Sequence, residues 1–119
     1  MTRRAAPIVL GQFNGTHSYH RLNRKCLLTD GAHYLAQTAG AFWLMDAAAS
    51  YLLELGTADW FVKIDLAAED STAFLSLEDG NGNIRAQQQI PYTDYPVQHQ
   101  ALYACWDGEF WVIMLPSEY

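Results

Sequence analysis

The sequence predicts an α+β fold, with an antiparallel β-meander of about five strands and two helices packed on one face. Three observations support this prediction. Apolar residues recur at helical spacing from residue 32 to 55, whereas beyond residue 60 they alternate with polar residues as in half-buried strands. The links between the alternating segments are short, which favours antiparallel neighbours. The 119 residues, half of them apolar, suit a single domain over 1–119.

Two helices are expected in the first half of the chain. Thr29 or Asp30 can cap the first helix, because a side-chain oxygen there accepts hydrogen bonds from free backbone N–H groups of the first turn. Gly40 interrupts the pattern. The second helix then follows "AFWLMDAAASYLLELG" to Gly56, a residue type suited to a helix end.

The second helix is unusually apolar. Between residues 42 and 55 its polar side chains are Asp46, Ser50 and Glu54, which form one narrow stripe. A helix that is apolar on nearly all sides needs burial on several sides. Either the first helix and the N-terminal arm cover it, or a second molecule does, as in a homodimer formed through helix 42–55.

The remaining segments read as strands. After a short strand or extended entry at "KCLLT" (25–29), the alternating runs are "WFVKIDL" (60–66), "STAFLSLED" (71–79), "IRAQQQI" (84–90), "VQHQALYACW" (97–106) and "EFWVIML" (109–115). "DGNGN" (79–83) and Asp107-Gly108 are strong turn signals. The four tryptophans, Trp43, Trp60, Trp106 and Trp111, are candidates for the core.

The link "YTDYP" (92–96) is rigid for structural reasons. Pro91 removes a ladder donor and helps to end its strand, and Pro96 favours an extended Tyr95. Asp94 can hydrogen-bond the backbone ahead of it and shape the turn. These roles leave the tyrosines unexplained, so Tyr92 and Tyr95 become candidates for a binding surface.

Charge is distributed unevenly along the chain. The first 28 residues contain five cations and no acid, and a basic, partly irregular N-terminal arm is expected over 1–24; the cations are Arg3, Arg4, Arg21, Arg24 and Lys25. The rest of the chain carries all 13 acids against Lys63 and Arg85, which leaves a formal charge near −11. Such a body disfavours nucleic acid as a ligand, because phosphate contacts need cations. It suits a basic protein partner, although solubility with an ion-paired arm accounts for it too.

No catalytic, cofactor or metal site is predicted. Zinc sites need three or four ligands in close pairs, and the sequence offers only the His17/His20 pair in "HSYH". Nothing resembles a nucleophile elbow or a phosphate loop. Cys26 and Cys105 are expected to be free thiols in a cytoplasmic protein, because no apolar run approaches the roughly 18 residues of a membrane span and no signal peptide is evident.

Several motifs occur together in order: "LLTDGAHYLAQTAGAFWLMDAAASY", "LEDGNGN", "QQIPYTDYP" and the terminal "LPSEY". They resemble a family of small bacterial proteins of unknown function whose members are often found on plasmids, prophages and other mobile elements. The resemblance covers about residues 13–119. This chain has Tyr95 where the family pattern has Phe, and Met45 where Leu is common. The resemblance implies a context and no mechanism: inhibitors of host machinery, such as anti-CRISPR proteins, are often small, acidic and non-catalytic.

We therefore expect a non-enzymatic protein-interaction module that binds and blocks a host protein or protein complex. Tyrosine is favoured at binding hot spots and acids steer a basic partner. The expected partner-binding residues are Tyr92, Asp94, Tyr95, Glu78 and Asp79.

The alternative is a small enzyme or ligand-binding domain with a pocket between helix and sheet. Such pockets combine an apolar lining with a few convergent polar groups. The residues expected to line it are Trp43, Asp46, Tyr92, Asp94 and His99.

Overall fold

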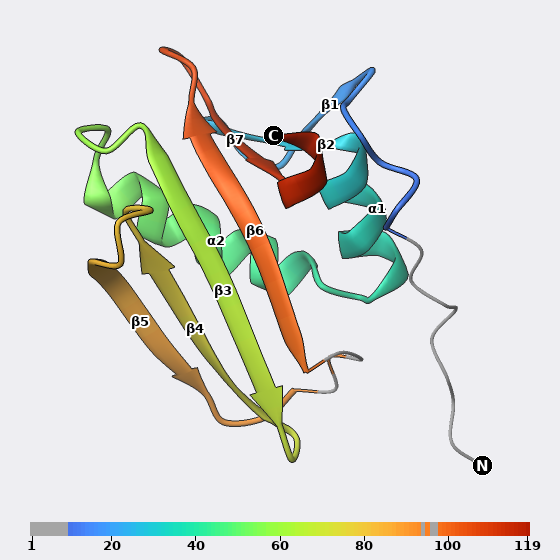
Figure 1. Cartoon of the computed structure of the whole chain (residues 1–119), viewed down its shortest axis with the longest axis vertical. Coiled ribbons are helices and arrows are strands. Elements are labelled where there is room, and N and C mark those ends of the chain that lie inside the picture. Colours follow the sequence, from blue (N-terminus) through green and yellow to red (C-terminus); the bar gives the residue numbers. More distant parts are fainter. Residues whose placement is uncertain (1–9, 94, 96–97) are drawn as a thin grey trace.

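The computed structural model describes residues 10–93, 95 and 98–119. In this part of the chain the elements are β1 (Tyr19–Arg21), β2 (Cys26–Thr29), α1 (Asp30–Thr38), α2 (Phe42–Leu55), β3 (Phe61–Glu69), β4 (Thr72–Glu78), β5 (Ile84–Ile90), β6 (His99–Trp106), β7 (Trp111–Met114) and a short 3₁₀ helix, η1 (Pro116–Glu118). The strands form one sheet; in Figure 1 α2 passes behind β3 and β6, and α1 lies beside β2. The predicted α+β class is confirmed, with seven described strands rather than about five.

The strand order is β1-β2-β7-β6-β3-β4-β5. β3, β4 and β5 form the expected meander, and β6 and β7 form a hairpin. A continuous meander was the wrong topology, however, because β6 pairs with β3 and not with β5. β2 joins the sheet parallel to β7, so the sheet is mixed.

Local signals account for the helix boundaries. The Thr29 side chain accepts a hydrogen bond from the Ala32 backbone N–H, as expected of an N-cap. Gly40 separates the helices with a φ of +62°, and Gly56 follows α2 with a φ of +81°. Both values lie in the left-handed region that glycine adopts without steric cost.

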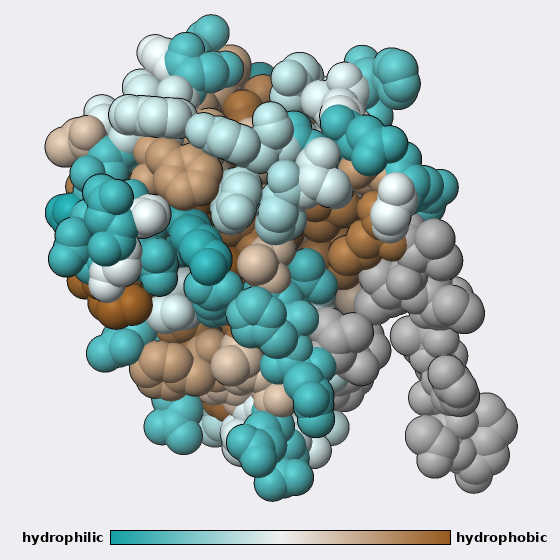
Figure 2. All heavy atoms as spheres, in the orientation of Figure 1, coloured by the Kyte–Doolittle hydropathy of each residue, from teal (hydrophilic) through white to brown (hydrophobic). Residues whose placement is uncertain are grey.

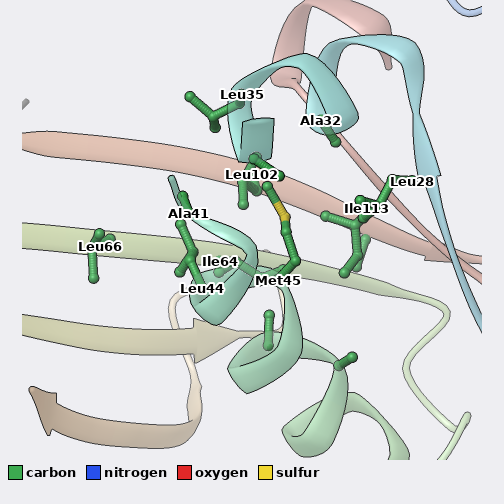
Figure 3. Packing of buried hydrophobic residues seen from close by; sticks show 14 of the residues in the cluster. Leu28, Ala32, Leu35, Ala41, Leu44, Met45, Ile64, Leu66, Leu102 and Ile113 are labelled. Atoms are coloured by element: carbon green, nitrogen blue, oxygen red, sulfur yellow. The ribbon is translucent and has the colours of Figure 1, made fainter. Parts of the chain in front are cut away.

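The core lies between the helices and one face of the sheet (Figure 3). In Figure 3 the Met45 side chain extends from α2 toward Leu102, between the helices and the strands. The chain itself covers most of α2, since Leu44, Met45, Ala48, Ala49 and Leu52 are all buried. The polar stripe faces solvent, together with the partly exposed Phe42 and Leu53.

The described part of the N-terminal arm is docked on the domain. Its Tyr19–Arg21 segment is the edge strand β1, which pairs antiparallel with β2. Leu10, Phe13 and Leu22 pack against the core. Residues 10–24 are therefore part of the fold, and Arg3 and Arg4 lie outside the described residues.

The tryptophans divide between the core and the surface. Trp111 is buried, and Trp43 and Trp106 are partly buried against the core. Trp60 is 57% exposed, so it is the one of the four candidates that lies at the surface. Within the described residues, no helix has both the length and the apolar character needed to cross a membrane.

Candidate functional site

The sheet has one covered face and one open face. Side chains alternate along β3, so that Val62, Ile64 and Leu66 are buried under the helices while Lys63 and Asp65 are turned to the other side. Figure 2 views this other face, which we call the open face, and shows apolar side chains distributed among polar ones.

Four rings gather at one end of the open face, and we call them the aromatic cluster: Trp60, Phe61, Tyr103 and Tyr119. The Phe61 centroid lies 5.9 Å from Trp60, 5.0 Å from Tyr103 and 5.4 Å from Tyr119. The rings meet edge to face, an arrangement that aromatic quadrupoles favour. Trp60 is 57% exposed and Tyr119 is 65% exposed. Much of the cluster is therefore available to another molecule.

A carboxylate clamp places Tyr119 in the cluster. Glu118 Oε1 accepts hydrogen bonds from the Thr29 hydroxyl at 2.6 Å and from the Leu115 N–H at 2.9 Å. Glu118 Oε2 accepts one from the Gly31 N–H at 2.9 Å. This carboxylate therefore lies at the N-terminus of α1, where the helix dipole favours an anion. The "TDG" and "LPSEY" motifs are thus two halves of one contact.

Acidic residues border the aromatic cluster. Asp59 Oδ2 accepts a hydrogen bond from Arg85 Nη1 at 2.6 Å. Asp79 accepts from the Asn83 side chain and from the Asn81 and Asn83 backbones, which holds the 79–83 turn. These hydrogen bonds, led by the Asn83 side chain, lower the pKa of Asp79. The turn therefore favours the charged form of Asp79, and Arg85 pairs with Asp59.

A hollow of about 450 Å³ lies between the cluster and the 79–83 turn; the residues that line it include Asp59, Trp60, Phe61, Asp79, Gly80 and Tyr119. At Gly80 a Cβ atom would lie 3.0 Å from Phe61 Cδ2, so the turn packs closely on the ring at a glycine with a φ of +87°. Glu78, next to Asp79, lies opposite Lys63 in the sheet.

The predicted partner-binding residues do not form one surface. Asp79 lines the hollow beside the aromatic cluster, and Glu78 precedes it as the last residue of β4. Tyr92 follows the far end of β5, where the Thr93 N–H donates to the Ser71 carbonyl in the β3–β4 turn. The seven residues of β5 separate the two groups, a span of roughly 20 Å at the usual rise per strand residue.

The two tyrosines of "YTDYP" differ in exposure. Tyr92 is 73% exposed, as expected for a surface residue. Tyr95 is only 8% exposed, its ring meets Trp43 edge to face at 6.4 Å, and its hydroxyl donates to Gln100 Oε1. Burial also raises the pKa of Tyr95. The expected exposure of Tyr95 is therefore wrong, and Asp94 lies outside the described residues.

The residues of the alternative pocket do not converge either. Trp43 and Asp46 belong to α2, on the covered side of the sheet. His99 lies beside Asp65, whose Oδ1 is 3.1 Å from His99 Nε2. That pair belongs to the open face, opposite the helices.

A histidine pair that sequence reasoning did not anticipate joins His20 of β1 to His33 of α1. His20 Nε2 lies 2.8 Å from Asp30 Oδ1, and the His20 and His33 rings stack with centroids 4.0 Å apart. The hydrogen bonds from His20 and then from the His17 N–H lower the pKa of Asp30 to about 2. Desolvation and the neighbouring His20 lower the pKa of His33. Among the described residues, no cluster of three or more His, Cys, Asp or Glu side chains is arranged to hold a metal ion.

Sequence reasoning also missed the aromatic cluster, because its rings come from three separate segments. The sequence held one signal for it. Consecutive residues of a strand point to opposite faces, and Phe61 begins a regular alternation that continues through Val62, Lys63 and Ile64. Alternation places Phe61 on the face opposite Val62. The contribution of Tyr119 depends on the Glu118 clamp, which no local pattern predicts.

Comparisons with known proteins bear on the fold. Residues 7–119 match the model of a family of proteins of unknown function, DUF6876. No curated protein matches the chain. One similar solved structure is the crystal structure of a protein of unknown function from Enterococcus faecalis. It shares 18% identity with a TM-score of 0.55, over 86% of this chain and 98% of that one, and supports the fold alone.

Proposed function

Because the chain belongs to the DUF6876 family, whose function is unknown, we propose its role from its own surface: it is a non-enzymatic protein-binding module. The open face of the sheet docks on a host protein or protein complex. The observation that supports this proposal is the exposed aromatic cluster, in which Trp60 and Tyr119 are each more than half exposed.

Exposed aromatic rings of this kind are costly to leave in water and are enriched at binding hot spots. Phe61 contacts both outer rings, and Tyr103 contacts Phe61 and Tyr119, so the surface is packed and preorganised rather than a set of isolated side chains. Preorganised aromatic surfaces lose little conformational entropy on binding.

Charge supports a partner with a basic surface. Asp59 and Asp79 line the hollow beside the cluster, Glu78 precedes Asp79 at the end of β4, and the formal charge of the whole chain is −6. Opposite charge accelerates encounter and excludes wrong partners. The resemblance to proteins of mobile elements supports the finer proposal that binding takes place in the cytoplasm and blocks host machinery.

Site-specific crosslinking tests the proposal. A photoreactive phenylalanine analogue replaces Trp60 in one variant and Glu54, exposed on α2, in a matched control. We expect a host protein to crosslink from position 60 and not from position 54, and Tyr119→Ala to reduce its yield. Equal yields from both positions would contradict a role for the open face.

Self-association through α2 is a second, compatible proposal, supported by the exposure of Phe42 and Leu53. Light scattering on the wild type and on Leu53→Lys tests it. A two-chain mass that falls to one chain in the variant would support it, and a one-chain mass for both would remove it.

A further inference from the structure

The hollow beside the aromatic cluster has the composition of a site for a cation. Three rings border it, those of Trp60, Phe61 and Tyr119. The outer two stand at 64° and 69° to Phe61, so the three rings lie in different planes where they border the hollow. Ring faces carry partial negative charge and attract a cation placed over them.

The rim adds full negative charge. Asp59 and Asp79 both line the hollow. Arg85, on strand β5 of the same chain, donates to Asp59 Oδ2, so the Asp59 carboxylate already receives a guanidinium here. The hydrogen bonds of the turn keep Asp79 ionised, so its charge persists without depending on a partner.

We propose that this hollow binds an arginine side chain of the protein partner, with its guanidinium against the rings and hydrogen-bonded to Asp59. The inference rests on the proposed function and names the chemistry of its central contact. Arginine fits better than lysine, because a planar guanidinium both stacks on aromatic faces and pairs with a carboxylate through two N–H groups. A volume of about 450 Å³ accommodates one such side chain.

A pair of model peptides tests the chemistry directly. The probes are a blocked Gly-Arg-Gly tripeptide and its citrulline counterpart, which keeps the shape and removes the charge. Both are titrated at millimolar concentration into the ¹⁵N-labelled full chain and followed by NMR. The arginine peptide should give saturable shifts of the Trp60 indole N–H and of the Gly80 and Asn81 amides, and the citrulline peptide should give none. Equal shifts with both probes, or shifts centred elsewhere, would overturn the inference.

Three variants sharpen the test. Trp60→Ala should abolish the saturable shifts at Gly80 and Asn81, while Tyr92→Ala, which removes an exposed ring at the far end of the sheet, should leave them unchanged. Arg85→Gln frees Asp59 from its internal partner and should tighten binding of the arginine peptide about two- to fivefold, the range expected for exposed ion pairs. Weaker binding by Arg85→Gln would contradict a site built on Asp59.

The crosslinking experiment separates this inference from the proposed function. If position 60 still crosslinks a host protein but the arginine peptide does not bind, the open face is a docking surface and the arginine site is wrong. If the peptide binds but nothing crosslinks from position 60, the arginine site is supported and the proposed function is contradicted.

Discussion

Gly31 is the residue at which two distant motifs of the chain meet. A Cβ atom at this position would lie 2.5 Å from Glu118 Oε1 and 2.6 Å from Leu115 Cδ1. Glu118 is held there by the Thr29 hydroxyl and the Gly31 and Leu115 N–H groups, and Leu115 is buried. Neither neighbour can withdraw without losing hydrogen bonds or core packing, so the absence of a side chain at residue 31 is a requirement of this contact.

Gly31→Ala should therefore lower the free energy of unfolding by about 1–2 kcal/mol. Overpacking costs about 1–3 kcal/mol, and the better helix propensity of alanine offsets up to about 1 kcal/mol of that loss. Urea denaturation measures the change. Gly11→Ala is the matched control, because nothing lies within 4 Å of its Cβ position. Equal effects from the two variants would rule out the clamp as the cause.

Asp30 is the carboxylate on which the N-terminal segment converges. Its Oδ2 accepts the His17 and Ser18 N–H groups, and its Oδ1 lies against His20. These contacts favour the charged form, which is why the pKa of Asp30 falls to about 2 from its ordinary value of 3.8.

The sign of the pH effect follows from this lowered pKa. The unfolded chain binds a proton at Asp30 more readily than the folded chain, so the contribution of Asp30 to stability is complete above pH 3.8 and is lost as pH falls toward 2. Asp30→Asn should therefore be less stable than the wild type at neutral pH. Between pH 3.8 and 2 its urea midpoint should fall less steeply than that of the wild type. The control is Asp46→Asn, at an exposed site on α2, whose urea midpoint should fall with pH as that of the wild type does. If the midpoint of Asp30→Asn falls as steeply as that of the wild type, Asp30 is not the group responsible.

At the scale of elements, the link from β5 to β6 is held by one of its two tyrosines. Tyr95 is buried against Trp43 and donates to Gln100 Oε1 at 2.9 Å, and the Gln100 side chain has little exposure of its own. Tyr92, three residues earlier, projects into solvent. Tyr95 therefore anchors the link in the core, whereas Tyr92 is a surface residue of the same link.

Removing the two hydroxyl groups separates these roles. Tyr95→Phe leaves a buried amide oxygen without its donor and should lower the free energy of unfolding by about 1–2 kcal/mol. Tyr92→Phe should change it by less than about 0.5 kcal/mol. Thermal and urea unfolding of the pair provide the measurement, and a Tyr95→Phe variant as stable as the wild type would show that the hydroxyl contact contributes nothing.

The elements that sequence predicts well are those set by near neighbours. The run from Phe42 to Leu55 repeats at helical spacing and is closed by Gly56, so its bounds follow from residues within one or two turns. β1 escapes prediction because its three residues, "YHR", are too few to alternate, and it is stabilised by pairing with β2.

The position of β6 and the aromatic cluster could not be predicted, because both depend on contacts between residues far apart in the sequence. β6 lies beside β3 because of pairings across more than 30 residues, such as Asp65 with Ala101. Glu78 and Asp79 were predicted as partner-binding residues from their local sequence, and Asp79 lines the hollow beside the cluster, whereas the rings there meet only after the strands assemble. Sequence patterns report which face a side chain takes, and tertiary pairing decides which other side chains share that face.

At the scale of the whole molecule, the two ends of the described chain are joined to each other. β2 pairs in parallel with β7, from Cys26 opposite Trp111 to Leu28 opposite Ile113. The Glu118 clamp then ties the last residues to the N-terminus of α1. The segments that fold back on each other are thus nearly the first and the last of the domain, and the core continues across them.

This closure predicts a single cooperative unfolding transition. Because β2 pairs with β7 along its length and α1 contacts β7 and the Glu118 carboxylate, we expect both to lose their structure once the C-terminal strand leaves the sheet. Tryptophan fluorescence and far-UV circular dichroism should therefore follow one urea transition with the same midpoint. The Leu28 amide should exchange its hydrogen only through global unfolding, at a rate set by the full free energy of unfolding. An earlier transition confined to β1, β2 and α1, or faster exchange at Leu28 than in β3, would show instead that the N-terminal third is an independent unit attached to a β3–β6 sheet.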